Sequence, residues 1–153
     1  MTENKIRILI ADDDPDICET LSVILKQEGY DTDIARNGEE AIEKSKNRFF
    51  NVALLDIKLP DMEGTKLLTA LLEDTPKMMK IMVTGYPSLQ NAVEALNQGA
   101  DAYVMKPVKP EKLLALIREK LEEQSQAEKM TEEKVTEWIK TRVRKIRPEN
   151  LQQ

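Results

Sequence analysis

Three consecutive aspartates, Asp12, Asp13 and Asp14, follow the apolar run ILIA at residues 8–11. Carboxylates this close together repel one another, and a cation among them offsets the repulsion. Carboxylate, carbonyl, water and phosphate oxygens are the ligands that Mg²⁺ prefers. We therefore expect Asp12 and Asp13 to bind a metal ion. Asp14 directly precedes Pro15, a favoured residue in a first helical turn, so we expect it to cap a helix instead.

Polar or conformationally special residues also end three later apolar runs. Asp56 follows NVALL, Thr84 and Gly85 follow KIMV, and Lys106 and Pro107 follow AYVM. An aspartate beside Mg²⁺, with a hydroxyl and a lysine nearby, has the groups needed to form an aspartyl phosphate. Lys106 would supply positive charge to the phosphoryl oxygens and Thr84 a hydroxyl donor. Gly85 would leave room for the phosphoryl group to approach the backbone.

The elements that must position these residues are strands and helices in alternation. The predicted strands are Lys5–Ala11, Asp31–Ala35, Asn51–Leu55, Lys80–Val83 and Ala102–Met105. The predicted helices are one that begins at Pro15 and ends before Gly29, followed by Gly38–Lys46, Gly64–Leu72, Ser88–Gln98 and Pro110–Glu122. Such alternation predicts an α/β fold, in which a doubly wound, five-stranded parallel sheet carries helices on both faces. The carboxyl ends of its strands line one functional edge, where all the polar residues above fall.

Composition excludes several classes of function. The chain has 153 residues, a formal net charge of −5 and no histidine. Without histidine there is no serine–histidine or cysteine–histidine nucleophile pair and no phosphohistidine of the chain's own, so a phosphoryl donor must come from outside. The single cysteine, Cys18, is predicted to be a small buried side chain and fits a reducing cytoplasm. We expect neither a signal peptide nor a membrane span.

The sequence resembles the receiver domain of two-component response regulators over about residues 4–122. The matching segments are ILIADDD, LLDIKLPDMEG, VTGYPS and GADAYVMKP, together with their spacing. The resemblance implies a flavodoxin-like fold with strand order 2-1-3-4-5. It also implies that Asp56 is the phospho-acceptor and that Asp12, Asp13, Asp56 and the backbone carbonyl of Lys58 bind Mg²⁺, or Mn²⁺ in its place.

The resemblance further assigns the residues that respond to the phosphoryl group. Thr84 becomes the switch hydroxyl and Lys106 the phosphate-contacting lysine. Tyr103 matches an aromatic switch position, although an aromatic residue there can also simply fill the edge of the sheet. The Lys106–Pro107 bond matches one that is usually cis in the family.

A histidine kinase would then donate the phosphoryl group, and the chain would catalyse only its own phosphorylation and dephosphorylation. Signalling would proceed by a change of the face formed by the fourth helix, fifth strand and fifth helix, through a homodimer or a protein partner. A haloacid-dehalogenase-type phosphatase is the enzymatic alternative. Such an enzyme needs a second aspartate as acid and base two residues after the nucleophile, where this chain has Lys58. An inert pseudo-receiver remains open, whereas nucleotide binding lacks its glycine-rich patterns.

The remaining residues, 123–153, are predicted to follow the receiver (residues 1–122) as a polar linker or helix continuation and a short amphipathic, basic helical tail. Thr131 could cap this last helix. Val135, Trp138, Ile139, Val143 and Ile146 share one helical face, and KTRVRKIR (residues 140–147) is densely basic. The tail could pair with another protomer, dock a partner or, as a transcriptional regulator would, contact DNA. Because too little chain follows for a DNA-binding domain, we expect a stand-alone receiver whose output is protein binding.

Overall fold

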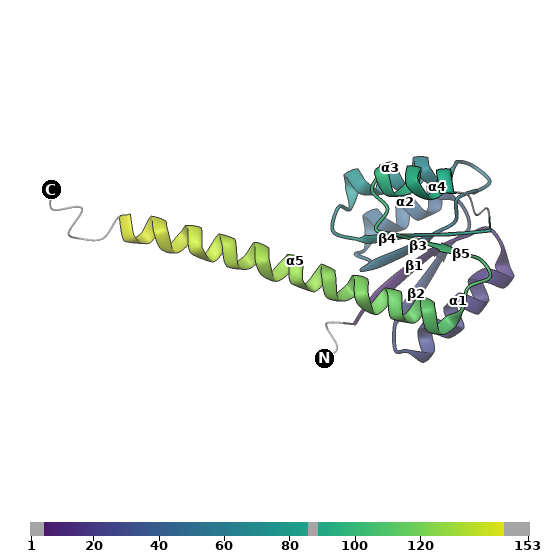
Figure 1. Ribbon diagram of the computed structural model, residues 1–153, viewed down its shortest axis with the longest axis horizontal. Helices are drawn as coiled ribbons and strands as arrows, with labels where there is room; N and C mark the ends of the chain where they lie inside the picture. The colour runs from purple at the N-terminus through teal and green to yellow at the C-terminus, as the bar shows by residue number, and fades with distance from the viewer. Residues whose placement is uncertain (1–4, 86–88, 146–153) are drawn as a thin grey trace. The chain divides into compact units, whose positions relative to one another are not determined.

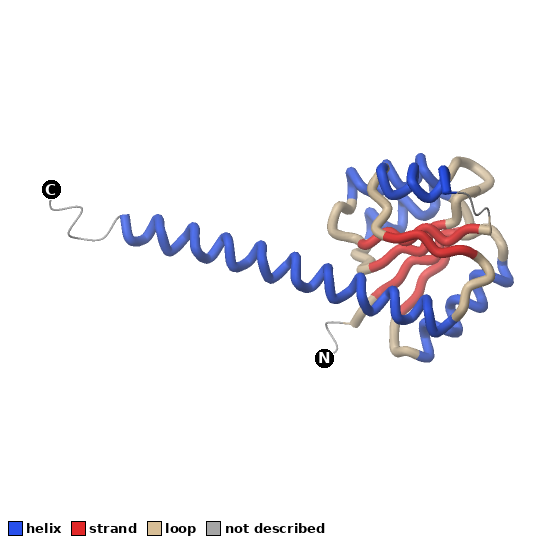
Figure 2. The backbone as a smooth tube through the Cα atoms, viewed as in Figure 1, coloured by secondary structure: helices blue, strands red, loops and turns tan. Residues whose placement is uncertain are grey.

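The computed structural model describes residues 5–85 and 89–145. The chain divides into two units, Met1–Leu121 and Glu122–Gln153, and each is described by itself. Figure 1 shows the course of the chain and Figure 2 its helices and strands.

Five parallel strands form the sheet of the first unit. They are β1 (Arg7–Ala11), β2 (Asp31–Ala35), β3 (Val52–Leu55), β4 (Met79–Thr84) and β5 (Ala102–Met105). Their order across the sheet is β2-β1-β3-β4-β5, and every neighbouring pair is parallel. The predicted α/β fold, strand order included, is therefore confirmed. All four residues of β3 are buried, as expected of a central strand covered on both faces.

Helices follow each strand, and several end as their sequences predict. They are α1 (Pro15–Gln27), α2 (Gly38–Asn47), α3 (Gly64–Asp74), α4 (Leu89–Asn97) and α5 (Pro110–Lys145). Asp14 caps α1, because its side chain accepts a hydrogen bond from the Asp16 amide at 2.9 Å. Gly29 and Gly99 follow α1 and α4 with φ of +90° and +108°, which a residue with a Cβ rarely adopts.

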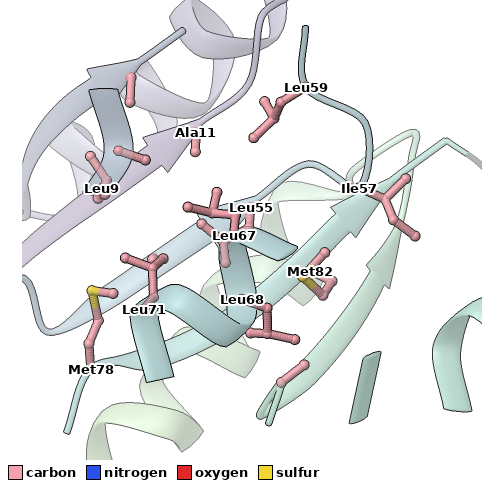
Figure 3. Close-up of a cluster of buried hydrophobic side chains, with 14 of the residues drawn as sticks. Leu9, Ala11, Leu55, Ile57, Leu59, Leu67, Leu68, Leu71, Met78 and Met82 are labelled. Carbon is pink, nitrogen blue, oxygen red and sulfur yellow. The ribbon is translucent and has the colours of Figure 1, made fainter. Parts of the chain in front are cut away.

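Two buried clusters hold the helices against the two faces of the sheet. Side chains alternate along β1, so Leu9 and Ala11 join the cluster beneath α2, α3 and α4, which Figure 3 shows. Ile8 and Ile10 join the cluster beneath α1 and the first turns of α5, which also contains the buried thiol of Cys18. This covering on both sides fixes the strands that carry the site.

Helix α5 continues without a break from Pro110 to Lys145. No glycine or proline occurs between Pro110 and Pro148, and the segment is rich in Glu, Lys, Leu and Arg, which favour helix. The alternative of a helix continuation is therefore correct, and the expectation that Thr131 caps a separate helix is wrong: its hydroxyl donates to the Ala127 carbonyl within α5 at 3.0 Å. Ile146 and Arg147 lie outside the described residues.

Candidate phosphoryl-accepting site

Three carboxylates meet at the carboxyl edge of the sheet. Asp12 and Asp13 follow β1, and Asp56 follows β3, whose register pairs Ala11 with Leu55. The Asp56 amide donates to the Ala11 carbonyl at 2.9 Å, so the two strand ends carry their aspartates side by side. Carboxylate oxygens of Asp12, Asp13 and Asp56 all lie within 4.8 Å of one another. Asp12 and Asp56 are buried, whereas Asp13 is exposed.

Lys106 provides the positive charge of the site from the end of β5. Its Nζ donates to Asp12 Oδ2 at 2.9 Å and lies 3.6 Å from Asp56 Oδ2. Burial disfavours the charged ammonium, but the hydrogen bond to Asp12 and the charges of Asp56 and Asp12 outweigh burial and raise the pKa of Lys106. Lys106 is therefore a stable cation between the two buried carboxylates.

Asp56 is the carboxylate whose buried oxygen is left open. Among the described residues its Oδ1 has no hydrogen-bond partner. Burial, and after it the charge of Asp12, raise the pKa of Asp56, while Lys106 opposes the rise. A buried, unpartnered carboxylate oxygen is costly unless a cation or another group completes its interactions.

Thr84 and Gly85 lie at the end of β4, between the ends of β3 and β5. The side chain of Thr84 is fully buried, and its backbone carbonyl accepts a hydrogen bond from the Lys106 amide at 2.7 Å. Gly85 is exposed at the pocket, and a Cβ built on it would have Lys106 Cδ, at 3.9 Å, as its nearest described neighbour. Space near Gly85 is therefore open toward the site.

The loop after Asp56 returns the chain over the end of β3. Lys58 and Glu63 pair as an isolated bridge, and the Gly64 amide donates to the Ile57 carbonyl at 2.6 Å. Lys58 lines the same pocket as the acidic residues. The residues that line it are Asp12, Asp13, Asp14, Asp56, Lys58, Gly85 and Lys106.

Tyr103 lies apart from this pocket. It pairs in register with Met82 on β4, is half-buried, and packs against the cluster beneath α2, α3 and α4. Burial raises the pKa of its phenol. Tyr103 and Pro107 line a neighbouring hollow along β5 and α5, and the Lys106–Pro107 peptide bond is cis.

Sequence reasoning missed two residues that support the site. Asp61 accepts hydrogen bonds from the amides of Gly38 and Glu39 at 2.8 and 2.9 Å, so the loop after β3 caps α2. Gly64 lies so close to β3 that a Cβ there would come within 2.5 Å of the Asp56 carbonyl oxygen. A glycine at the start of a leucine-rich helix is a sequence signal for the role of Gly64. The capping contact of Asp61 has no such signal, because it joins residues 23 positions apart.

The acidic cluster fits a magnesium ion. Two buried carboxylates and one exposed carboxylate provide oxygens of the kind Mg²⁺ prefers, and the open Oδ1 of Asp56 needs such a partner.

In the described part of the chain no helix has both the length and the apolarity of a bilayer span.

Fold and site together define a receiver. The sequence profile of the response regulator receiver domain matches residues 8–118, and the chain belongs to this family. It is 37% identical over 115 residues to the DNA-binding response regulator MtrA of Mycolicibacterium smegmatis, covering 75% of this chain and 50% of MtrA. It is 34% identical over 121 residues to the transcriptional regulatory protein ZraR of Escherichia coli O157:H7, covering 79% of this chain and 27% of ZraR. The chain thus spans about half or less of the length of these curated relatives.

Solved structures show the same fold. The CheY-like receiver domain protein of Methanospirillum hungatei is 55% identical, with a TM-score of 0.79, covering 81% of this chain and 99% of that one. The beryllofluoride-activated NtrC4 receiver domain dimer is 37% identical, with a TM-score of 0.74, covering 77% of this chain and 98% of that one. Receiver domains accept phosphoryl groups from histidine kinases and bind Mg²⁺ in an acidic pocket.

Proposed function

We propose that this chain is a phosphoryl-accepting switch in which Asp56 takes a phosphoryl group from the phosphohistidine of a histidine kinase. The observation that carries the proposal is the buried, unpartnered Oδ1 of Asp56, which lies among Asp12, Asp13 and Lys106. The free thiol of Cys18 suits a reducing cytoplasm, where we place this exchange.

Asp12, Asp13, Asp56 and the backbone carbonyl of Lys58 would hold the metal ion. When bound, Mg²⁺, or Mn²⁺ in its place, neutralises charge on the phosphoryl oxygens. An ion held there would also offset the charge of Asp12, which, after burial, raises the pKa of Asp56. With the ion on one carboxylate oxygen of Asp56, the other oxygen would act as the nucleophile.

In the transfer, a carboxylate oxygen of Asp56 forms a bond to phosphorus as the bond from phosphorus to the kinase imidazole nitrogen breaks. The electron pair leaves with that nitrogen, and the product is an acyl phosphate on Asp56. Water later attacks phosphorus and releases inorganic phosphate, which restores the carboxylate. The chain thus catalyses only its own modification and is not an enzyme with a separate substrate.

Lys106 and Thr84 would read the phosphoryl group. Lys106 already lies 3.6 Å from Asp56 Oδ2, so it can exchange its hydrogen bond to Asp12 for one to a phosphoryl oxygen. Thr84, at the end of the adjacent strand, would donate its hydroxyl. A shift of Thr84 would give Tyr103 room to turn inward and change the surface formed by α4, β5 and α5, where a second copy or a protein partner would dock.

The test is intact-mass spectrometry of the chain with acetyl phosphate, with and without Mg²⁺, beside Asp56→Asn. We expect a phosphoryl adduct that requires both Mg²⁺ and Asp56. Absence of an adduct under every condition would contradict the proposal and leave an inert receiver-like binding module.

A further inference from the structure

The described part of the second unit is one helix whose residue types follow a fixed order. Side chains from Ser125 to Val143 are all exposed. Residues 122–133 contain five glutamates and one lysine, and residues 134–145 contain five basic residues and one glutamate. Between the acidic and basic ends lie exposed apolar side chains, with Val135 51%, Trp138 59% and Ile139 49% exposed. The order along the helix is therefore acidic, apolar, basic.

The apolar residues form one stripe. Val135, Trp138 and Ile139 are spaced by three and four residues, which places them on the same face of a helix, and Val143 extends it. The Arg142 guanidinium lies 4.9 Å from the centroid of the Trp138 ring, so a cation borders the stripe.

Interactions within the helix account for only part of this order, because the helix dipole favours basic residues near the C-terminal end of α5. The acidic end lies several turns after Pro110, where the helix dipole no longer favours negative charge. Two like-charged pairs at i, i+4 spacing, Glu128–Glu132 and Glu133–Glu137, destabilise an isolated helix, and one opposite-charged pair, Lys129–Glu133, offsets one of them. An intermolecular partner is the arrangement that makes use of these charges.

We propose that residues 128–145 pair with the same residues of a second copy of the chain as an antiparallel helix pair. Reversal of one helix brings the acidic end of each copy opposite the basic end of the other, while the two apolar stripes meet in the middle. Crossing near Thr136–Trp138 brings Val135 of one copy beside Ile139 of the other and Glu132 opposite Arg142. The contact is isologous, so each of these pairs forms twice.

Other occupants satisfy only part of the pattern. An anionic membrane or an acidic protein would attract the basic end but repel the three glutamates Glu128, Glu132 and Glu133. A parallel pair of copies would place like charges opposite each other at both ends. Only the reversed second copy matches all three parts of the helix.

Sedimentation equilibrium of the full, unphosphorylated chain tests the proposal, without Mg²⁺ or phosphoryl donor. We expect a dimer at low salt whose dissociation constant rises at least about threefold on going to high salt, since exposed charges are screened. Glu132→Lys with Glu133→Lys should abolish the dimer, as should Lys140→Glu with Arg142→Glu. The chain with all four changes is again self-complementary and should dimerise. Glu43→Lys with Glu73→Lys on the receiver, an equal change in charge, should have no effect.

A spin label at Ser125→Cys, in a Cys18→Ala background, tests the orientation. An antiparallel pair that crosses near Trp138 separates the two labels by about 35 Å at 1.5 Å per residue, whereas a parallel pair brings them within about 20 Å. Three results would each overturn the proposal: a short distance between the two labels, a monomeric chain at about 200 μM and low salt, or a monomeric variant that carries all four charge changes. Because the same measurements on Asp56→Asn should agree, their outcome is independent of the phosphorylation proposed above.

Discussion

Substituting Gly64 tests how the loop after Asp56 is held against β3. A Cβ at this position would lie 2.5 Å from the Asp56 carbonyl oxygen and 2.7 Å from Ile57 Cα. Both are backbone atoms of the segment that carries Asp56, so neither can move aside as a flexible side chain would. Gly64→Ala must therefore displace either the start of α3 or the end of β3.

The expected cost follows from two opposing effects. Overpacking of this kind costs about 1–3 kcal/mol. Alanine favours helix over glycine by up to about 1 kcal/mol, and by less at a first helical residue such as Gly64. We expect Gly64→Ala to lose about 1–2 kcal/mol of the free energy of unfolding, which lowers Tm by about 3–10 °C in a domain of this size.

Gly85→Ala is the matched control, because its Cβ would meet its nearest described neighbour, Lys106 Cδ, only at 3.9 Å. Urea titration and thermal unfolding followed by circular dichroism measure both variants. We expect Gly85→Ala to unfold within about 2 °C of wild type, since an exposed site without overpacking usually tolerates such a change. Equal stability of Gly64→Ala and wild type would refute the reasoning.

Three further predictions concern charge. Burial, and after it the charge of Asp12, raise the pKa of Asp56. The free energy of unfolding therefore falls as the pH rises from the ordinary carboxyl pKa through the raised one, because Asp56 must then ionise in its buried site. In EDTA, Asp56→Asn should melt above wild type at neutral pH, with the gap closing near about pH 4, and a constant gap would contradict this. Lys106→Gln removes a charge that lowers that pKa, so adduct yield with acetyl phosphate should need a more alkaline pH than in wild type; superimposable pH profiles would argue against it. Hydrogen bonds from the first amides of α2 lower the pKa of Asp61. Its stabilising effect is present above the ordinary carboxyl pKa and lost as the pH falls, so Asp61→Ala should lower Tm at neutral pH and much less in acid; an equal loss at both would count against the capping role.

The strand ends and helix caps could be predicted because they are local. Alternating apolar runs indicated the five strands, and the parallel rule then brought Asp12 and Asp56 to one edge, where the structure has them within 4.8 Å. Asp14 before Pro15 predicted a cap, and the structure has that hydrogen bond. In each case the determining residues are neighbours in the sequence.

Contacts between distant segments could not be predicted in this way. The hydrogen bond from Lys106 to Asp12 joins residues 94 apart, and which carboxylate it selects depends on the twist and register of the sheet. The same holds for the capping of α2 by Asp61. The sequence left open, for another reason, whether α5 continues past its first turns. Its polar composition suits both a solvated helix and a linker. The absence of glycine and proline favours a helix only where the flanking residues are also helical.

The central claim is that Asp56, and not another carboxylate of the cluster, carries the phosphoryl group. Borohydride reduces an acyl phosphate and converts the modified aspartate to homoserine, so peptide mass spectrometry after reaction with acetyl phosphate and Mg²⁺ identifies the acceptor. We predict homoserine at position 56, because Oδ1 of Asp56 is buried and open while Asp12 is bound by Lys106. Homoserine at position 12 or 13, with Asp56 unmodified, would contradict the account.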